Sequence, residues 1–340
     1  MPVIVPNRTD SHPNALLTEI SVAYGQDPNG FVADKVFQNI SVSKSVNIVA
    51  RIPRGAFNRN DVKPRAPGTE SQSVQWERDQ SLVYNCVPSA LSTYITDDLR
   101  DDEDDPFDAD AEATLLLTNK VLIERDVNFA AEFMVTTAWS GESAGVAAGA
   151  GSGGGGAPGS GQFLQWDDDD STPIEDIRAA ITARAEATGF RMNVLTLGRR
   201  VFDAMIDHPD IVARVNQGQT PGGPAMVNKQ RLTEIFELDE ILVMDSVVNT
   251  AIEGAVEASS FIGGKTALLT YRPAKPGKMT PAAGYTFTWR GERRQNGPQG
   301  WSIEKWYERN KRADKIEINQ AYDQFRIGQD LGHLFLTAVA

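Results

Sequence analysis

The chain has 340 residues, of which 41% are apolar and 23% charged, and its formal net charge is -13. At about 150 residues per domain, this length predicts two domains. The composition excludes collagen-like, mucin-like and wholly disordered chains, and no uncharged run approaches the roughly 18 apolar residues of a membrane helix. We therefore expect a globular protein without a membrane partner.

Charge is segregated along the sequence. Residues Asp97 to Glu112 contain ten acids and one base, and Asp167 to Asp170 add four acids. Bases gather in Arg51 to Arg65, with five against one acid, and in Arg272 to Arg312, with ten against three. Because a phosphate-binding surface needs net positive potential, so acidic a chain is not expected to bind duplex nucleic acid in general.

No cofactor or metal site is predicted. Cys86 is the only cysteine, so it cannot form an internal disulfide, and no Cys/His cluster is spaced for zinc. The acidic runs Asp101 to Asp105 and Asp167 to Asp170 lack the glycine and spaced ligands of a calcium loop, which favours a solvated surface. The start of the sequence, MPVIVPNRTDSHPNALL, has no charged start and apolar core of a secretory signal, so we expect a cytoplasmic setting.

The first quarter of the chain predicts elements that project from the body. To about Phe37, scattered apolar residues among Pro, Asn and Asp indicate an extended arm with at most one short helix. The alternating segments SVNIVARI, from Ser45, and SVQWERDQSLVY, from Ser73, predict the two strands of a long β-hairpin with a polar tip. Connections that long are usually functional or disordered, so part of the hairpin should project.

One long helix is predicted after the acidic run. Asp105 followed by Pro106 is a favourable helix start, and Asp108 complements the positive end of the helix dipole. Apolar residues then recur at intervals of four or seven, at Phe107, Ala111, Leu115, Leu122, Phe129 and Phe133. A helix to about Met134 would be a rod of roughly 40 Å.

A glycine-rich tract separates this helix from an α/β segment. From Gly141 to Gly161, nearly every second residue is glycine, which predicts a flexible loop or domain boundary. Thr172 to Glu175 then reads as a capping box that starts a helix ended by Gly189. The strand-like segments MNVLTL, ILVMDSVV and TALLTY alternate with helices to about Pro276, and the tail from Tyr285 is mostly strand.

The motifs that would suggest enzymatic activity lack the neighbouring secondary structure or spacing that each of them requires. Gly141-Glu-Ser143-Ala-Gly145 matches a nucleophile elbow, but that turn needs a following helix, and glycine-rich sequence follows instead. Gly264-Lys265-Thr266 resembles the end of a phosphate-binding loop without its first glycine. The three histidines, His12, His208 and His333, are not brought together by any motif. We predict that the protein is not an enzyme, with a Ser143 hydrolase as the less favoured alternative.

The order of these parts resembles the major capsid proteins of tailed bacteriophages, which have the Hong Kong ninety-seven type fold. Segments from almost the whole chain carry the resemblance: FVADKVFQNISVSKSV, YITDDLRDDEDDPFDADAEATLLLTNKVLIERD, LGRRVFDAMIDHPDIVARV, ELDEILVMDSVVNTA, FIGGKTALLTYRP and GYTFTW. The glycine-rich tract is a departure from the family pattern. The resemblance implies an α+β fold in which a long spine helix and a long-stranded antiparallel sheet form one domain and an α/β unit forms another.

The resemblance also implies how the chain is divided. The expected parts are an N-terminal arm (1-41), an E-loop hairpin (42-84), a P-domain (85-162) with a spine helix at about 106-135 and the glycine-rich loop 141-161, an A-domain (163-280), and late P-domain strands (281-340) whose terminal strand returns to the A-domain. Covalent cross-linking, which occurs in some members, is not carried over, because no Lys or Asn here matches that chemistry by motif.

The function implied is that of a structural subunit of an icosahedral virus shell. Such a subunit self-assembles as pentamers and hexamers around packaged double-stranded DNA, without binding a specific sequence. Its expected partners are itself, a portal, and scaffolding or decoration proteins. Its expected location is the virion capsid, after assembly in the host bacterial cytoplasm. A cellular nanocompartment shell of the same fold is the alternative that the sequence leaves open.

Charge segregation suggests where neighbouring subunits touch. The hairpin tip offers Arg51, Arg54, Arg59, Lys63 and Arg65, and the turn before the long helix offers Asp101, Asp102, Glu103, Asp104 and Asp105. The resemblance implies that the E-loop lies over a neighbour's P-domain. We therefore predict that the basic tip docks near the acidic turn of the adjacent subunit, through pairs worth about 0 to 1 kcal/mol each.

Overall fold

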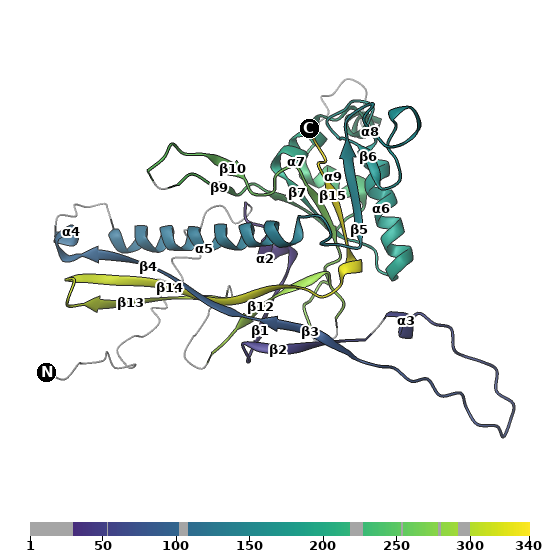
Figure 1. Ribbon diagram of the computed structural model, residues 1–340, viewed down its shortest axis with the longest axis horizontal. Coiled ribbons are helices and arrows are strands. Elements are labelled where there is room, and N and C mark those ends of the chain that lie inside the picture. The colour runs from purple at the N-terminus through teal and green to yellow at the C-terminus, as the bar shows by residue number, and fades with distance from the viewer. Residues whose placement is uncertain are drawn as a thin grey trace.

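The computed structural model describes residues 30–52, 54–101, 108–217, 227–252, 254–277, 280–291 and 300–340. Two mixed sheets, one long helix and one projecting loop account for the shape (Figure 1). Most of the expected arm, residues 1–29, lies outside the described residues. In the parts of the chain that the structure describes, no helix combines the length and apolar character needed to cross a membrane.

A five-stranded sheet forms the elongated half of the molecule. Its strands are β1 (Asn39–Val42), β4 (Val87–Thr96), β12 (Gly284–Trp289), β13 (Trp301–Glu308) and β14 (Ala313–Arg326). The long strand β14 pairs antiparallel with β4, β12 and β13, and β1 adds to β12 in parallel. The late strand-rich sequence therefore returns to pair with strands from the first third of the chain.

The long helix α5 (Ala109–Phe133) lies along this sheet (Figure 1). It begins later than Asp105 and Pro106 predict, because Asp108 is the N-cap and its carboxylate accepts hydrogen bonds from the N–H groups of Asp110 and Ala111. The short helix α4 (Asp97–Asp101) precedes it. The expected position Phe107 lies outside the described residues.

The buried face of α5 differs from the predicted one. Every fourth residue of one stripe is buried, namely Ala113, Leu117, Val121, Arg125, Phe129 and Phe133. Of the predicted set, only Phe129 and Phe133 are buried, and Ala111, Leu115 and Leu122 are half-exposed. The first part of the stripe packs on Ile95, Ile303, Ile316 and Ile318 of the sheet. The sequence did not predict this stripe, because Arg125 places a charge in the middle of its apolar pattern.

A six-stranded sheet and four helices form the α/β half. The strand order is β6 (Gln162–Leu164), β5 (Gly141–Val146), β15 (Gly332–Leu336), β11 (Ala267–Thr270), β7 (Val194–Gly198) and β8 (Glu240–Met244). The helices are α6 (Pro173–Thr188), α7 (Arg199–Asp207), α8 (Pro209–Gln217) and α9 (Lys229–Phe236). Helix α6 starts at Pro173 and ends at Gly189 as predicted, but the Thr172 side chain makes no capping hydrogen bond.

The prediction of a loop over the whole of Gly141 to Gly161 is wrong at its start. Gly141–Val146 is strand β5, which pairs in parallel with β15 and with β6. Glycine is needed there for space: a Cβ on Gly145 would lie 2.1 Å from the carbonyl oxygen of Thr337. The remainder contains the short 3-10 helix η1 (Gly154–Gly156), and the side chain of Gln162 accepts hydrogen bonds from Ser152 and Gly159.

The two halves share one hydrophobic core at the C-terminal end of α5. The short helix α2 (Ala33–Val36) leads to Phe37, whose ring lies 5.2 Å from that of Phe129 and 4.8 Å from that of Phe133. Trp139 completes this aromatic cluster, and the core continues through the six-stranded sheet. The 3-10 helix η2 (Gln329–Leu331) then leads from β14 into β15.

Two β-hairpins extend away from these cores (Figure 1). Strands β2 (Val46–Arg51) and β3 (Asp79–Asn85) pair antiparallel, as the alternating segments predict, although residues 73–78 stay outside the strand. Strands β9 (Val247–Asn249) and β10 (Ser259–Phe261) form the second pair. Val42, the predicted start of the first hairpin, belongs to β1 instead.

Candidate assembly surfaces

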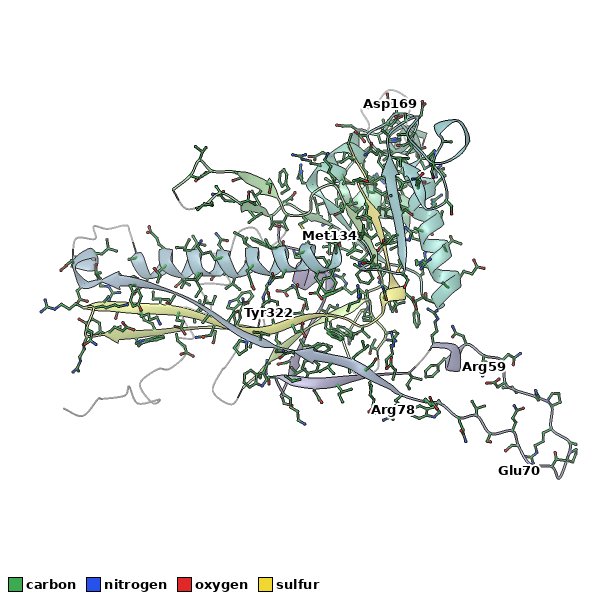
Figure 2. The ribbon with its side chains drawn as sticks, in the orientation of Figure 1. Arg59, Glu70, Arg78, Met134, Asp169 and Tyr322 are labelled. Carbon is green, nitrogen blue, oxygen red and sulfur yellow. The ribbon has the colours of Figure 1, made fainter. Side chains whose placement is uncertain are left out.

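A projecting loop, residues 54–78, connects β2 to β3 and contains the short helix α3 (Arg54–Phe57). Figure 2 shows Glu70 at its outer end, with Arg59 and Arg78 nearer the body. Phe57 is 70% exposed and Val62 is 91% exposed, and Val74 and Trp76 are exposed as well. Exposed apolar side chains on a projecting segment make it a candidate interaction surface, since covering them removes apolar area from water.

The five predicted basic contacts all lie on or beside this loop, and three are available for a partner. Arg51 pairs with Asp79 across the two strands at 3.0 Å, and Arg54 pairs with Asp330 at 3.1 Å. Both pairs are solvent-exposed and therefore weak. Arg59, Lys63 and Arg65 are exposed and make no ion pair with any residue that the structure describes.

The hydrogen bonds of Asp79 keep the base of the loop in place. Its carboxylate accepts from the side chain and the N–H group of Ser81, which lowers the pKa of Asp79, and Arg51 lowers it further. The ionised form is therefore the favoured one at neutral pH.

The predicted acidic contacts lie mostly outside the described residues. Asp102, Glu103, Asp104 and Asp105 are not among them, and Asp101 ends α4. Of the acids that flank the turn, Asp110 is paired inside the chain, with Arg100 at 2.9 Å and Lys305 at 2.5 Å, and Arg100 also lies 2.5 Å from Asp314 of β14. The hydrogen bond from Arg100 to Asp314 raises the pKa of the guanidinium.

The basic loop and helix α4, which precedes the acidic turn in the sequence, lie at opposite ends of the molecule (Figure 1). The loop extends beyond one end of the five-stranded sheet, and α4 lies at the other. Contact between them within one chain is therefore ruled out, and contact between two chains would be head to tail. Head-to-tail contacts generate a closed ring when the rotation that relates successive subunits divides a full turn.

A buried carboxylate on α5 holds the segment that ends the N-terminal arm. Asp126 is 1% exposed, and its Oδ1 accepts hydrogen bonds from the N–H groups of Val32 at 3.2 Å and Ala33 at 3.0 Å. Ser246, between β8 and β9, donates its hydroxyl to Oδ2 at 2.7 Å. Burial raises the pKa of Asp126 to about 6, and these hydrogen bonds oppose the rise. One side chain thus links α5, α2 and the α/β half.

The neighbouring Arg125 is equally buried, at 1% exposure. Its guanidinium pairs with Asp34 of α2 at 2.7 Å and stacks against the rings of Trp301 and Tyr322, with its carbon 4.8 Å and 4.7 Å from the ring centres. Sequence analysis missed both residues. The signal that could have found them is an adjacent Arg and Asp on the face of a helix that is otherwise apolar.

The whole chain is similar in structure to viral and cellular shell proteins. A phage-related protein from Bordetella bronchiseptica has a TM-score of 0.70 at 18% identity, covering 96% of this chain and 98% of that one. The capsid protein of cyanophage P-SCSP1u has a TM-score of 0.55 at 10% identity, over 88% and 86% of the two chains. This chain has the capsid fold of tailed bacteriophages.

The capsid fold also includes cellular shells. An encapsulin from Synechococcus elongatus has a TM-score of 0.53 at 10% identity, over 91% of this chain and 87% of that one. No protein-family model matches the sequence, and no curated protein matches it. At these identities the likeness defines the fold, and function has to be argued from the surfaces.

Within the capsid fold, Ser143 does not occupy a nucleophile elbow. It lies in strand β5, and its hydroxyl is 3.1 Å from Nε2 of His333 on β15. The other ring nitrogen of His333 has no hydrogen-bond partner among the described residues and faces Gly141 and Arg184 rather than a carboxylate. Burial, with Arg184 beside it, lowers the pKa of His333 to about 4. Pairing of β5 with β15 explains the contact, which sequence analysis did not foresee.

The other motifs have structural roles. His208 is buried and bonds to the Ser171 hydroxyl at 2.9 Å, and it accepts from the N–H group of Asp210. Gly264 to Thr266 form the turn before β11, as expected from the failed phosphate-loop spacing. Cys86 is buried, which raises the pKa of its thiol to about 12. Among the described residues, no His, Cys, Asp and Glu side chains group as metal ligands.

Proposed function

We propose that the protein is the structural subunit of an icosahedral virus shell that self-assembles as pentamers and hexamers around double-stranded DNA. One observation carries the proposal: a chain with the capsid fold over its whole length exposes apolar and basic side chains on a loop that projects from the body. Burial of that loop on a neighbouring copy would remove apolar surface from water, at about 25 cal/mol per Å².

The fold's expected division supports this role. In the proposal, the arm runs to about residue 41, the E-loop to residue 84, and 85-162 with 281-340 form the P-domain, except that strands β5 and β15 join the sheet of the A-domain. Residues 163-280 form the A-domain, which would surround the axis of each pentamer or hexamer. The subunit acts without catalysis or cofactor, with itself, a portal and scaffolding or decoration proteins as partners. It assembles in the host bacterial cytoplasm and resides in the virion capsid.

Light scattering after size-exclusion chromatography, together with negative-stain microscopy, tests the proposal. The purified chain should give closed particles in the megadalton range. A variant in which a short Gly-Ser linker replaces residues 54–78 should stay folded but should not assemble. It should stay folded because, among the described residues, the ion pair of Arg54 is the loop's one ion pair to the body. A stable monomer of the full chain at high concentration would refute the shell function.

The basic tip and the acidic turn of adjacent copies form the second part of the proposal. Reversing Arg54, Arg59 and Arg65 to Glu should block assembly, and also reversing Asp101, Asp102 and Asp104 to Lys should partly restore it. Salt of about 1 M, which shortens the Debye length to about 3 Å, should slow assembly. Normal assembly of the triple reversal would exclude this contact and leave the acidic turn as a solvated surface.

A cellular nanocompartment is the second candidate, because an encapsulin shares the fold. The contents of particles purified from the native host separate the two functions. Nuclease-protected double-stranded DNA of genome length supports the viral shell, whereas a single enriched protein cargo supports the nanocompartment.

A further inference from the structure

A groove of about 460 Å³ lies between the C-terminal half of α5 and the sheet beneath it. Figure 2 shows Tyr322, one of its residues, on the sheet below the helix. Helix α5 contributes Glu124, Asn128 and Glu132, and the strands contribute Val87, Tyr322 and Asp323. None of the described residues that line it is Lys or Arg.

The three carboxylates of the groove form no ion pair with a described residue. Glu124 accepts hydrogen bonds from the amides of Asn128 and Gln320 and from the Tyr322 hydroxyl, all of which are neutral. Asp323 accepts from the N–H group of Asn85 at 2.7 Å. Burial raises the pKa of Glu132 and of Asp323, and in Glu132 this outweighs the opposing charge of Arg326. A cation placed among these acids would stabilise their ionised forms.

Two further features indicate that the groove is incomplete in a single chain. Gln324, which is 4% exposed, also lines it, and its side-chain oxygen has no hydrogen-bond donor among the described residues. Val87 is 60% exposed on β4, an edge strand whose outer side pairs with no described strand. Buried acceptors without donors and exposed apolar groups at a strand edge both favour a bound segment that donates hydrogen bonds and covers the apolar surface.

The projecting loop carries a pair of side chains with the matching chemistry. Trp76 is 53% exposed, and the Arg78 guanidinium lies 5.0 Å from the centre of its ring. Arg78 makes no ion pair with a described residue. Trp and Arg are enriched among the residues that dominate interface energies, and a guanidinium can bond two carboxylates at once.

We propose that Trp76 and Arg78 of a second copy dock in this groove, with the guanidinium between Glu132 and Asp323 and the indole ring over Val87. This assignment rests on the proposed self-assembly and names the receiving surface for the loop. The adjacent backbone, residues 70–78, is extended outside any strand, so it can follow the exposed edge of β4.

The docking is compatible with the contact proposed for the basic tip. Along α5, Glu132 lies about 35 Å from the helix start at Ala109, at ~1.5 Å per residue. The extended segment from Arg78 back to Arg65 can span up to about 45 Å. One loop lying along a neighbour's α5 can therefore reach from the groove to the start of that helix, which the acidic turn precedes in the sequence.

Charge reversal measures the contact. Arg78→Glu should raise the protein concentration at which shells appear by about thirtyfold, as expected for an interface hot spot. Glu132→Arg in the same chain should recover a large part of that loss. Arg200→Glu, at an exposed arginine on α7, and Glu186→Arg, at an exposed acid on α6, control for the changes in net charge.

Cross-linking locates the contact independently of assembly strength. Glu77→Cys and Asn128→Cys chains, one carrying a tag that changes its mass, are mixed before assembly and treated with a short bismaleimide; Glu77 is exposed and lies between Trp76 and Arg78, so both docking residues are kept. The mixed dimer should form, and chains with only the buried Cys86 should give none. If shells form without the mixed dimer, and Arg78→Glu assembles like the parent, the groove assignment is wrong while the proposed shell function stands. Absence of shells from the parent chain would overturn the proposed function and this assignment together.

Discussion

Replacing Asp126 by Asn tests whether the carboxylate that holds α2 is a buried titrating group. The pKa of Asp126 is about 6 in the folded protein, against 3.8 for an exposed aspartate. The folded state therefore binds the proton more tightly than the unfolded state, so this group lowers the free energy of unfolding as pH rises from about 4 through 6. At about 1.4 kcal/mol per pKa unit, the full loss is about 3 kcal/mol.

Asparagine keeps a carbonyl acceptor for the N–H groups of Val32 and Ala33 and cannot ionise. The free energy of unfolding of Asp126→Asn, minus that of the parent, should therefore rise by about 2.5 kcal/mol between pH 4 and pH 8. Asp126→Ala should be less stable than Asp126→Asn at every pH, because each unsatisfied buried donor costs about 1 to 3 kcal/mol.

Urea unfolding followed by tryptophan fluorescence provides the measurement, with every variant made in the chain whose projecting loop is shortened, so that assembly does not contribute. Glu186→Gln, an exposed carboxylate on α6, is the matched control and should leave the pH dependence unchanged. A difference between Asp126→Asn and the parent that stays constant from pH 4 to pH 8 would show that Asp126 titrates like an exposed acid, and the reasoning from burial would be wrong.

Three further outcomes are expected. Gly145→Ala should destabilise the fold by about 1 to 3 kcal/mol, because its Cβ would clash with a backbone carbonyl, whereas Gly154→Ala, which meets nothing within 4 Å, should leave the melting temperature unchanged. Ser143→Ala should alter neither particle shape nor any background ester hydrolysis; loss of labelling by a serine-directed probe in that variant would restore the hydrolase alternative. Arg125→Leu should lower the free energy of unfolding, because it removes the ion-pair partner of Asp34, and adding Asp34→Leu should recover part of it, as urea titration can measure.

Sequence alone determined the elements whose formation depends on neighbouring residues. Alternating apolar residues predicted β2, β3 and the late strands, and the Asp-Pro start with the recurring apolar residues predicted α5 to within a few residues, although not its buried face. The same local signals predicted a projecting hairpin, since a polar segment with several prolines cannot form a core of its own. The resemblance to phage capsid proteins added the order of the parts, and the capsid fold confirms it at the level of the whole chain.

The tertiary structure decided the features that depend on contacts between distant residues. Gly141–Val146 is a strand only because β15, near the end of the chain, supplies its hydrogen bonds and leaves no room for larger side chains. Arg125 and Asp126 are buried on α5 only because α2 and Ser246 provide their partners. The acidic groove likewise joins α5 to β14, a strand from the last tenth of the sequence. Composition and periodicity report a residue's own backbone preference, whereas its burial and its partners are set by chain segments that no local pattern identifies.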